Sequence, residues 1–264
     1  MARYKDNILS GKLGPYVFRN DNGRQIVTSR VASGKIKQTE QTKNAASTFG
    51  MASSLGSHIR QTFETEIAAL QDREMTNRIT SLLNRALILS RNPVTKKFSF
   101  GADIFNEMEG FDFNSRSPLK KSLTKPLNIS MDDGKLQVLL PDLSVPNTLK
   151  FPSGSSSCQL TVNVGLFRLY DGLKIYQPIS QDITIQKTKP VLGEQKFEFE
   201  IPDGCFCVVT LFLKYSTTVK GKTVLINSKT FSPAAICLAV ITPGNFTDHS
   251  NYSWAAMQRL IFEA

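Results

Sequence analysis

The sequence predicts an α+β protein, in which an N-terminal β-hairpin and a helical hairpin precede an immunoglobulin-like antiparallel β-sandwich. Three observations support this prediction. Residues 12–31, KLGPYVFRNDNGRQIVTSRV, place an Asn-Gly pair between two strand-like runs. Apolar residues then recur every three or four positions between 45 and 70. After residue 126, short alternating runs follow one another, separated by turn residues.

The register of the N-terminal hairpin follows from its turn. A type I′ turn needs positive φ at both central residues, which Asn-Gly tolerates. With Asn22-Gly23 as the turn, the predicted cross-strand pairs are Asp21–Arg24, Arg19–Ile26, Phe18–Val27 and Val17–Thr28. No third strand is predicted nearby. A two-stranded hairpin alone is only marginally stable, since both edges and both faces are open, so its own chain or a second copy must cover it.

Two helical segments are predicted after the hairpin, within residues 37–70 and 73–90. Each has an apolar stripe at helical spacing. The stripes consist of Ala45, Phe49, Ala52, Leu55, Ile59, Phe63, Ile67 and Leu70, and of Met75, Ile79, Leu82, Leu83, Ala86 and Leu87. Asn92-Pro93 ends the second segment. Either a helical hairpin or one long broken helix fits this pattern.

The rest of the chain divides into a connector, a β-region and a tail. We predict a hairpin and helical domain at 1–115, a β-sandwich of seven or eight short strands at 116–242, and a docking tail at 243–264. The tail is too apolar to stay in solvent, since it contains Trp254, Leu260, Ile261 and Phe262. We expect it to dock on its own chain or on a neighbour.

Composition and charge narrow the class of protein. The chain has 264 residues, of which 41% are hydrophobic and 20% charged, with a net charge of +10. A packed core is therefore expected. Nine basic and three acidic residues lie within the first 43 positions. This segment is either a solvated basic surface or a face for nucleic acid or another acidic surface. The candidate polyanion-binding residues are Lys12, Arg19, Arg24, Arg30, Lys35 and Lys37.

The start of the sequence, MARYKDNILSGKLG, lacks the apolar stretch of a secretory signal, and no apolar run approaches membrane-helix length, so no membrane insertion is expected. The predicted location is the cytoplasm or an exported or virion-like assembly. The four cysteines, Cys158, Cys205, Cys207 and Cys237, are expected to be buried thiols, while a disulfide stays open if the protein is extracellular.

No catalytic motif is found. The chain has two histidines, His58 and His249, and neither belongs to a recognisable nucleophile–base arrangement. Phosphate-loop, dinucleotide-binding and zinc-protease motifs do not occur in the sequence. We therefore expect a protein that is not an enzyme and that uses no cofactor or metal.

The N-terminal segments also resemble the opening of a large family of uncharacterised Bacteroidota proteins. The matching positions are Gly11, Lys12, Gly14, Pro15 and Gly23 in the hairpin, and Thr39, Gln41, Lys43 and Phe49 at the helix start. The similarity covers about residues 8–95 and is looser beyond. The resemblance implies the same order of hairpin, basic connector, helix and C-terminal β-sandwich. It implies no catalytic or ligand-binding residues.

These observations lead to a functional hypothesis of self-assembly into a filament, tube or ring by a structural protein. The predicted subunit-interface residues are Tyr16, Val17, Phe18, Ile26, Val27, Phe49, Leu55 and Ile59. The alternative is a nucleic-acid-binding accessory protein that uses the basic segment. A carbohydrate- or surface-binding adhesin is a third hypothesis, based on fold analogy alone.

Overall fold

The structure, a computed structural model, forms two compact units, residues 1–46 and 47–264. We describe each unit by itself. The described residues are 2–5, 7–21, 23–29, 39–67, 71–132, 134–246, 252–258 and 260–264. The mixed α+β class is confirmed. The predicted division at 115/116 does not appear, because the helices and the β-strands that follow them share one core.

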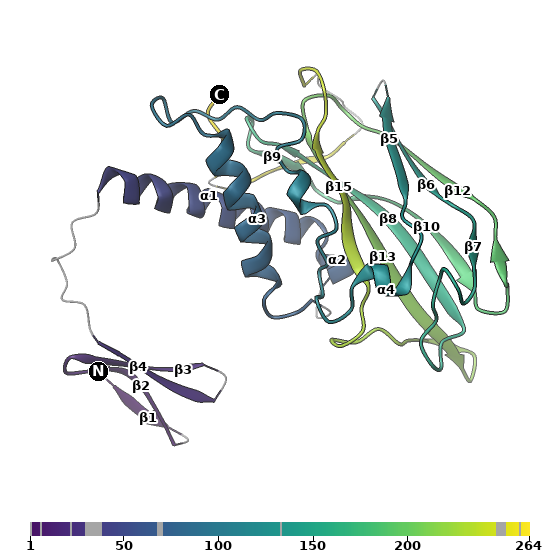
Figure 1. The fold of residues 1–264 in the computed structure, drawn as a ribbon, viewed down its shortest axis with the longest axis horizontal. Coiled ribbons are helices and arrows are strands. Elements are labelled where there is room, and N and C mark those ends of the chain that lie inside the picture. Colours follow the sequence, from purple (N-terminus) through teal and green to yellow (C-terminus); the bar gives the residue numbers. More distant parts are fainter. Residues whose placement is uncertain are drawn as a thin grey trace. The chain divides into compact units, whose positions relative to one another are not determined.

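The N-terminal unit is a four-stranded antiparallel sheet rather than a lone hairpin (Figure 1). Its strands, in spatial order, are β1 Arg3–Lys5, β2 Ile8–Leu13, β3 Tyr16–Asp21 and β4 Arg24–Ser29. The predicted register between β3 and β4 is confirmed at all four pairs. The prediction of two isolated strands was wrong. Gly11, expected to punctuate the entry, lies inside β2 with φ of 104° and pairs with Phe18.

The helices of the second unit include two long ones that cross and pack against each other, so the alternative of one long broken helix is wrong (Figure 1). They are α1 Glu40–Thr62, which begins in the first unit, α2 Glu64–Ile67 and α3 Met75–Ser90, with short turns at η1 Asn106–Met108 and α4 Leu119–Ser122. A Cβ on Gly56 of α1 would lie 3.3 Å from Leu83 Cδ1 of α3. Further along, Arg91 donates a hydrogen bond of 2.7 Å to Thr48 Oγ1. The small residues of α1 thus admit the side chains of α3.

The β-strands of this unit form one large and two smaller sheets. The seven-stranded sheet contains β8 Ser157–Arg168, β9 Leu173–Ile175, β10 Ile179–Gln186, β13 Phe206–Val219, β14 Lys222–Leu225, β15 Ala234–Ile241 and β16 Trp254–Ala256. The three-stranded sheet contains β5 Asn128–Asp132, β6 Lys135–Leu140 and β12 Gln195–Glu200. A further pair consists of β7 Leu143–Ser144 and β11 Val191–Leu192.

The large sheet is buried on both faces, and β13 shows why. Val208 and Phe212 point into a core shared with α1 and α3. Val209, Leu211 and other residues of opposite parity point into a second core shared with the three-stranded sheet. A strand covered on both sides needs apolar residues at successive positions, which explains the run at 205–213, where Thr210 is the one polar residue. Neither core includes a described residue of the N-terminal unit.

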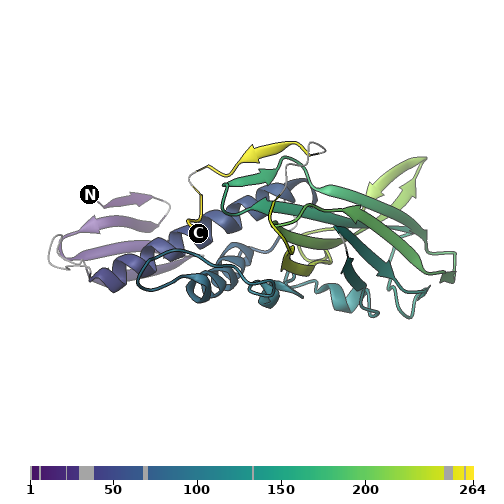
Figure 2. The ribbon, with the colours of Figure 1, turned by 90° about the horizontal axis from the view of Figure 1, so that it is seen from above.

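The C-terminal tail docks on its own chain. Strand β16 pairs with β9, as Figure 2 shows for the yellow strand. The Phe262 ring is 1% exposed and packs edge-on against Phe98 and Phe100, with centroids 5.0 and 5.2 Å away. The four cysteines are free thiols. Among the described residues, no helix is long and apolar enough to cross a membrane.

Candidate functional site: the N-terminal sheet

The register of the N-terminal sheet sorts the side chains of Lys12–Leu13, β3 and β4 onto two different faces, because cross-strand partners point to the same side. The first, which we name the uncharged face, consists of Leu13, Tyr16, Phe18, Asn20, Gln25, Val27 and Ser29. The second, the cationic face, consists of Lys12, Val17, Arg19, Asp21, Arg24, Ile26 and Thr28. The sheet is therefore amphipathic.

Apolar side chains on the uncharged face are open to solvent. Leu13, Tyr16 and Val27 are 56%, 51% and 51% exposed, and Phe18 is half-buried. Large apolar side chains are normally found singly at a surface, whereas here they gather on one small sheet. A four-stranded sheet without a core of its own gains little from burial, so covering this face would stabilise it.

The sheet also has an open edge at β4, whose six residues are all exposed. The two-residue turn makes Asp21–Arg24 a hydrogen-bonded pair, and hydrogen-bonded and non-hydrogen-bonded pairs alternate along the ladder. Gln25 and Val27 therefore direct their backbone N–H and C=O groups away from β3. No other described segment takes up these groups. Such an edge is a template for another strand.

The remaining predicted interface residues have different environments. Phe49 is 54% exposed on α1. Leu55 and Ile59 are completely buried in the core beside α3, so their assignment to an interface was wrong. The apolar stripe of α1 is satisfied within the chain. Val17 and Ile26 lie on the cationic face, opposite Tyr16, so the hairpin residues do not form a single apolar surface.

The predicted polyanion-binding residues are partly brought together. Lys12, Arg19 and Arg24 are exposed on the cationic face, although they come from three different strands. Arg30, Lys35 and Lys37 lie outside the described residues. The register predicted from the turn already places Phe18 and Val27 on one face and Arg19, Arg24 and Ile26 on the other. The position of Lys12 could not be predicted, because it depends on the pairing of β2 with β3.

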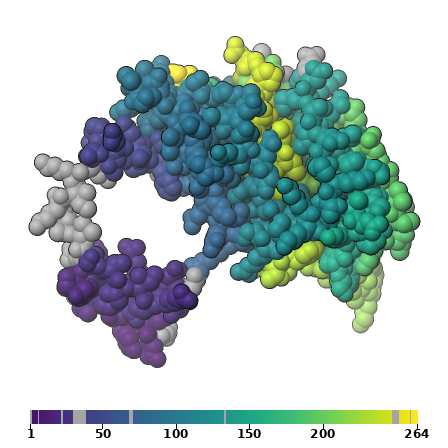
Figure 3. All heavy atoms as spheres, in the orientation of Figure 1, coloured from purple at the N-terminus to yellow at the C-terminus, as the bar shows by residue number. Residues whose placement is uncertain are grey.

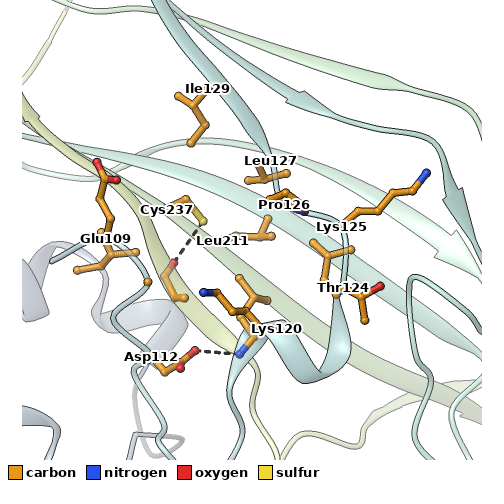
Figure 4. A pocket seen from close by; sticks show the side chains of 15 residues that line it. Glu109, Asp112, Lys120, Thr124, Lys125, Pro126, Leu127, Ile129, Leu211 and Cys237 are labelled. Atoms are coloured by element: carbon orange, nitrogen blue, oxygen red, sulfur yellow. Dashed lines mark hydrogen bonds between the residues drawn. The ribbon is translucent and has the colours of Figure 1, made fainter. Parts of the chain in front are cut away.

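A cavity of about 500 Å³ lies elsewhere, in the second unit, between β15 and the segment from α4 to β5. Figure 3 shows β15 as a yellow-green band at this surface, and Figure 4 shows Leu211 and Cys237 on the wall below Leu127 and Ile129. The three-stranded sheet ends at β5, which leaves this part of the facing sheet uncovered.

Two charged groups of this cavity, Asp112 and Lys125, already have partners within the chain. The Asp112 carboxylate accepts a 2.8 Å hydrogen bond from the Leu119 N–H, and burial raises its pKa. Lys125 Nζ lies 2.9 Å from Asp142 Oδ1. Burial also raises the pKa of Cys237 to about 12, so this side chain stays a thiol at neutral pH and is a poor nucleophile. The cavity supplies an apolar wall without a nucleophile–base pair.

A second polar cluster is structural. Lys174 of β9 donates hydrogen bonds to His58 O at 3.4 Å and to Gln61 Oε1 at 3.2 Å. Burial, followed by the charge of Lys174, lowers the pKa of His58. The His58 side chain is buried, because it flanks the apolar stripe at the Leu55 and Ile59 positions. No cluster of described His, Cys, Asp and Glu side chains could hold a metal ion.

The N-terminal sheet is thus the candidate site, because its apolar side chains are exposed and its edge strand β4 has no hydrogen-bonding neighbour beyond β3 among the described residues. The resemblance to a Bacteroidota family stays a prediction. No family model, curated protein or solved structure matches this chain.

Proposed function

We propose that this protein is a non-enzymatic structural protein whose copies assemble through the uncharged face and open edge of the N-terminal sheet. The observation that carries the proposal is the exposure of Leu13, Tyr16 and Val27 on a sheet that contributes to neither core. Full burial of such side chains contributes on the order of 1.5–3 kcal/mol each. A partner that covers this face would therefore be held by a substantial apolar contact.

Charge indicates which face a second copy would use. Two molecules with a net charge of +10 repel each other, most strongly where their basic groups meet. The uncharged face lets two copies approach without opposing like charges. The cationic face would place Lys12 and Arg19 of one copy against the same groups of another.

The edge strands favour repetition of the contact. Strands β1 and β4 form opposite edges of the sheet. If β4 of one copy adds to β1 of the next, each copy keeps one free edge and the contact can repeat. A filament or tube results when the rotation does not close, and a ring when it does.

We also propose that the β-strands of the second unit form an immunoglobulin-like sandwich displayed by this assembly. Support comes from alternate residues of β6 (Leu136, Val138) and of β12 (Phe197), which share a core with β8 and β13. Two sheets that bury alternate residues against each other are typical of that architecture. In this arrangement the N-terminal sheet assembles and the β-rich unit faces outward.

The assembly is tested by light scattering after size-exclusion chromatography. Wild-type protein should elute with a mass above the 29.3 kDa of one chain. Val27→Lys places a charge on the uncharged face and should return the protein to a monomer. Negative-stain microscopy of the wild type should show the polymer or ring directly.

Thr28→Lys is the matched control. Thr28 neighbours Val27 on the same exposed strand and points to the cationic face, so its replacement adds the same charge to β4 without placing it on the uncharged face. We expect Thr28→Lys to assemble like the wild type. A monomeric wild type, or equal masses for the wild type and Val27→Lys, would refute the proposal.

A further inference from the structure

We infer that the cationic face of the N-terminal sheet binds the phosphate backbone of nucleic acid. The register places three basic residues along a diagonal of the sheet. Lys12 lies beside Val17, Arg19 is two residues further along β3, and Arg24 lies beside Asp21, two residues further still. Each step crosses one strand and advances two residues, so neighbouring Cα atoms are about 8 Å apart, from strand spacings of about 4.8 Å and rises of about 3.4 Å.

This spacing makes the three charges act together. The Debye length at physiological ionic strength is about 8 Å, so their potentials overlap instead of being screened from one another. All three side chains are exposed. The planar guanidinium groups of Arg19 and Arg24 can each donate two parallel hydrogen bonds to one phosphate. Asp21 faces Arg24 and offsets part of its charge, so Lys12 and Arg19 should contribute most.

No aromatic side chain on which bases could stack is among the residues assigned to the cationic face. Tyr16 and Phe18 lie on the opposite side of the sheet, and the remaining members of the cationic face are Val17, Ile26 and Thr28. Single-strand binders that hold bases usually combine cations with aromatic platforms on one surface. The contact should therefore be with phosphates and independent of sequence.

The placement of the apolar groups also favours nucleic acid over an anionic membrane. Proteins that lie in a membrane interface insert apolar side chains while their cations reach lipid headgroups. Here the most exposed apolar side chains of β2 to β4, those of Leu13, Tyr16 and Val27, point away from the cations, and Ile26 is the exposed apolar side chain beside them. One aliphatic side chain offers little surface to insert into a bilayer, whereas a polyphosphate chain needs only the cationic row.

The experiment measures fluorescence anisotropy of labelled single-stranded and duplex DNA of two unrelated sequences with the full chain, over a series of salt concentrations. Binding should be detectable at low ionic strength and similar for both sequences. For duplex DNA, three phosphate contacts predict a slope of about −2.7 for log K against log salt. Arg19→Ala should weaken binding to every sequence and reduce the slope by about 1.

Lys97→Ala is the control, because it removes the same charge from an exposed loop residue of the second unit. It should leave the slope and affinity unchanged, and Arg19→Lys should retain most of the slope. Far-ultraviolet circular dichroism checks that the variants are folded. The inference is overturned if low salt gives no anisotropy change, if Lys97→Ala weakens binding as much as Arg19→Ala, or if the protein sediments with phosphatidylserine vesicles and does not bind DNA.

Discussion

At Gly165, strand β8 comes so close to the end of α1 that no side chain fits between them. A Cβ at this position would lie 2.8 Å from Phe63 Cζ and 3.3 Å from Thr62 Cγ2. Phe63 is fully buried, so its ring cannot move aside without disturbing the core. The close packing of α1 on the large sheet thus requires glycine, which has no side chain beyond hydrogen, at position 165 of β8.

We therefore predict that Gly165→Ala destabilises the protein by about 1–3 kcal/mol, the usual cost of overpacking a core. Gly193→Ala is the matched control, since nothing lies within 4 Å of its Cβ position. Urea unfolding followed by tryptophan fluorescence measures both. Equal stability of the two variants would show that β8 and α1 can separate at little cost.

Some residue-scale features could be predicted because they depend on local chemistry. Asn22-Gly23 determines the pairing of β3 with β4, and that register is confirmed. The environments of Leu55 and His58 could not be predicted. A helix that packs on its own chain and a helix that packs on a second copy show the same apolar stripe in the sequence. Only the tertiary contact with α3 distinguishes the two.

Among the elements, strongly periodic segments were predictable and irregular ones were not. The apolar stripes predicted α1 and α3. Strand β2 was missed, because Ile8-Leu9-Ser10-Gly11 does not alternate and its glycine resembles a turn residue. The segment at 96–113 also has no regular period, and it contributes five buried side chains to the helical core, Phe98, Phe105, Met108, Phe111 and Phe113.

The C-terminal segment provides a test at this scale. Phe262 is almost fully buried between Phe98 and Phe100, whereas its neighbour Ile261 is 62% exposed. We predict that Phe262→Ala lowers the free energy of unfolding by about 3–5 kcal/mol. Ile261→Ala should change it by less than about 0.5 kcal/mol. Chemical denaturation distinguishes these outcomes, and a mild effect of Phe262→Ala would mean that the tail contributes little to the core.

At the scale of the whole molecule, the two units have different sources of stability. Both hydrophobic cores lie within residues 47–264. The N-terminal sheet has backbone hydrogen bonds and small apolar clusters, which seldom suffice for an isolated sheet with open faces. The sequence analysis placed the helices in the same domain as the hairpin. An apolar stripe shows that a helix is buried, but it does not show which part of the chain covers it. The packing of the helices on the large sheet assigns them to the second unit instead.

A chain shortened to residues 47–264 should therefore fold and stay monomeric. It retains both cores, and Ser47, a favourable N-cap residue, would begin the shortened α1. Its urea unfolding midpoint should match that of the second unit in the full chain, since no core residue is lost. Light scattering should give the mass of one chain, while the full chain assembles. If the shortened chain assembles as the full chain does, the second unit carries the contact, and the role proposed for the N-terminal sheet is wrong. If the shortened chain is insoluble or unfolded, its helices depend on residues before Ser47, which contradicts the division into two units.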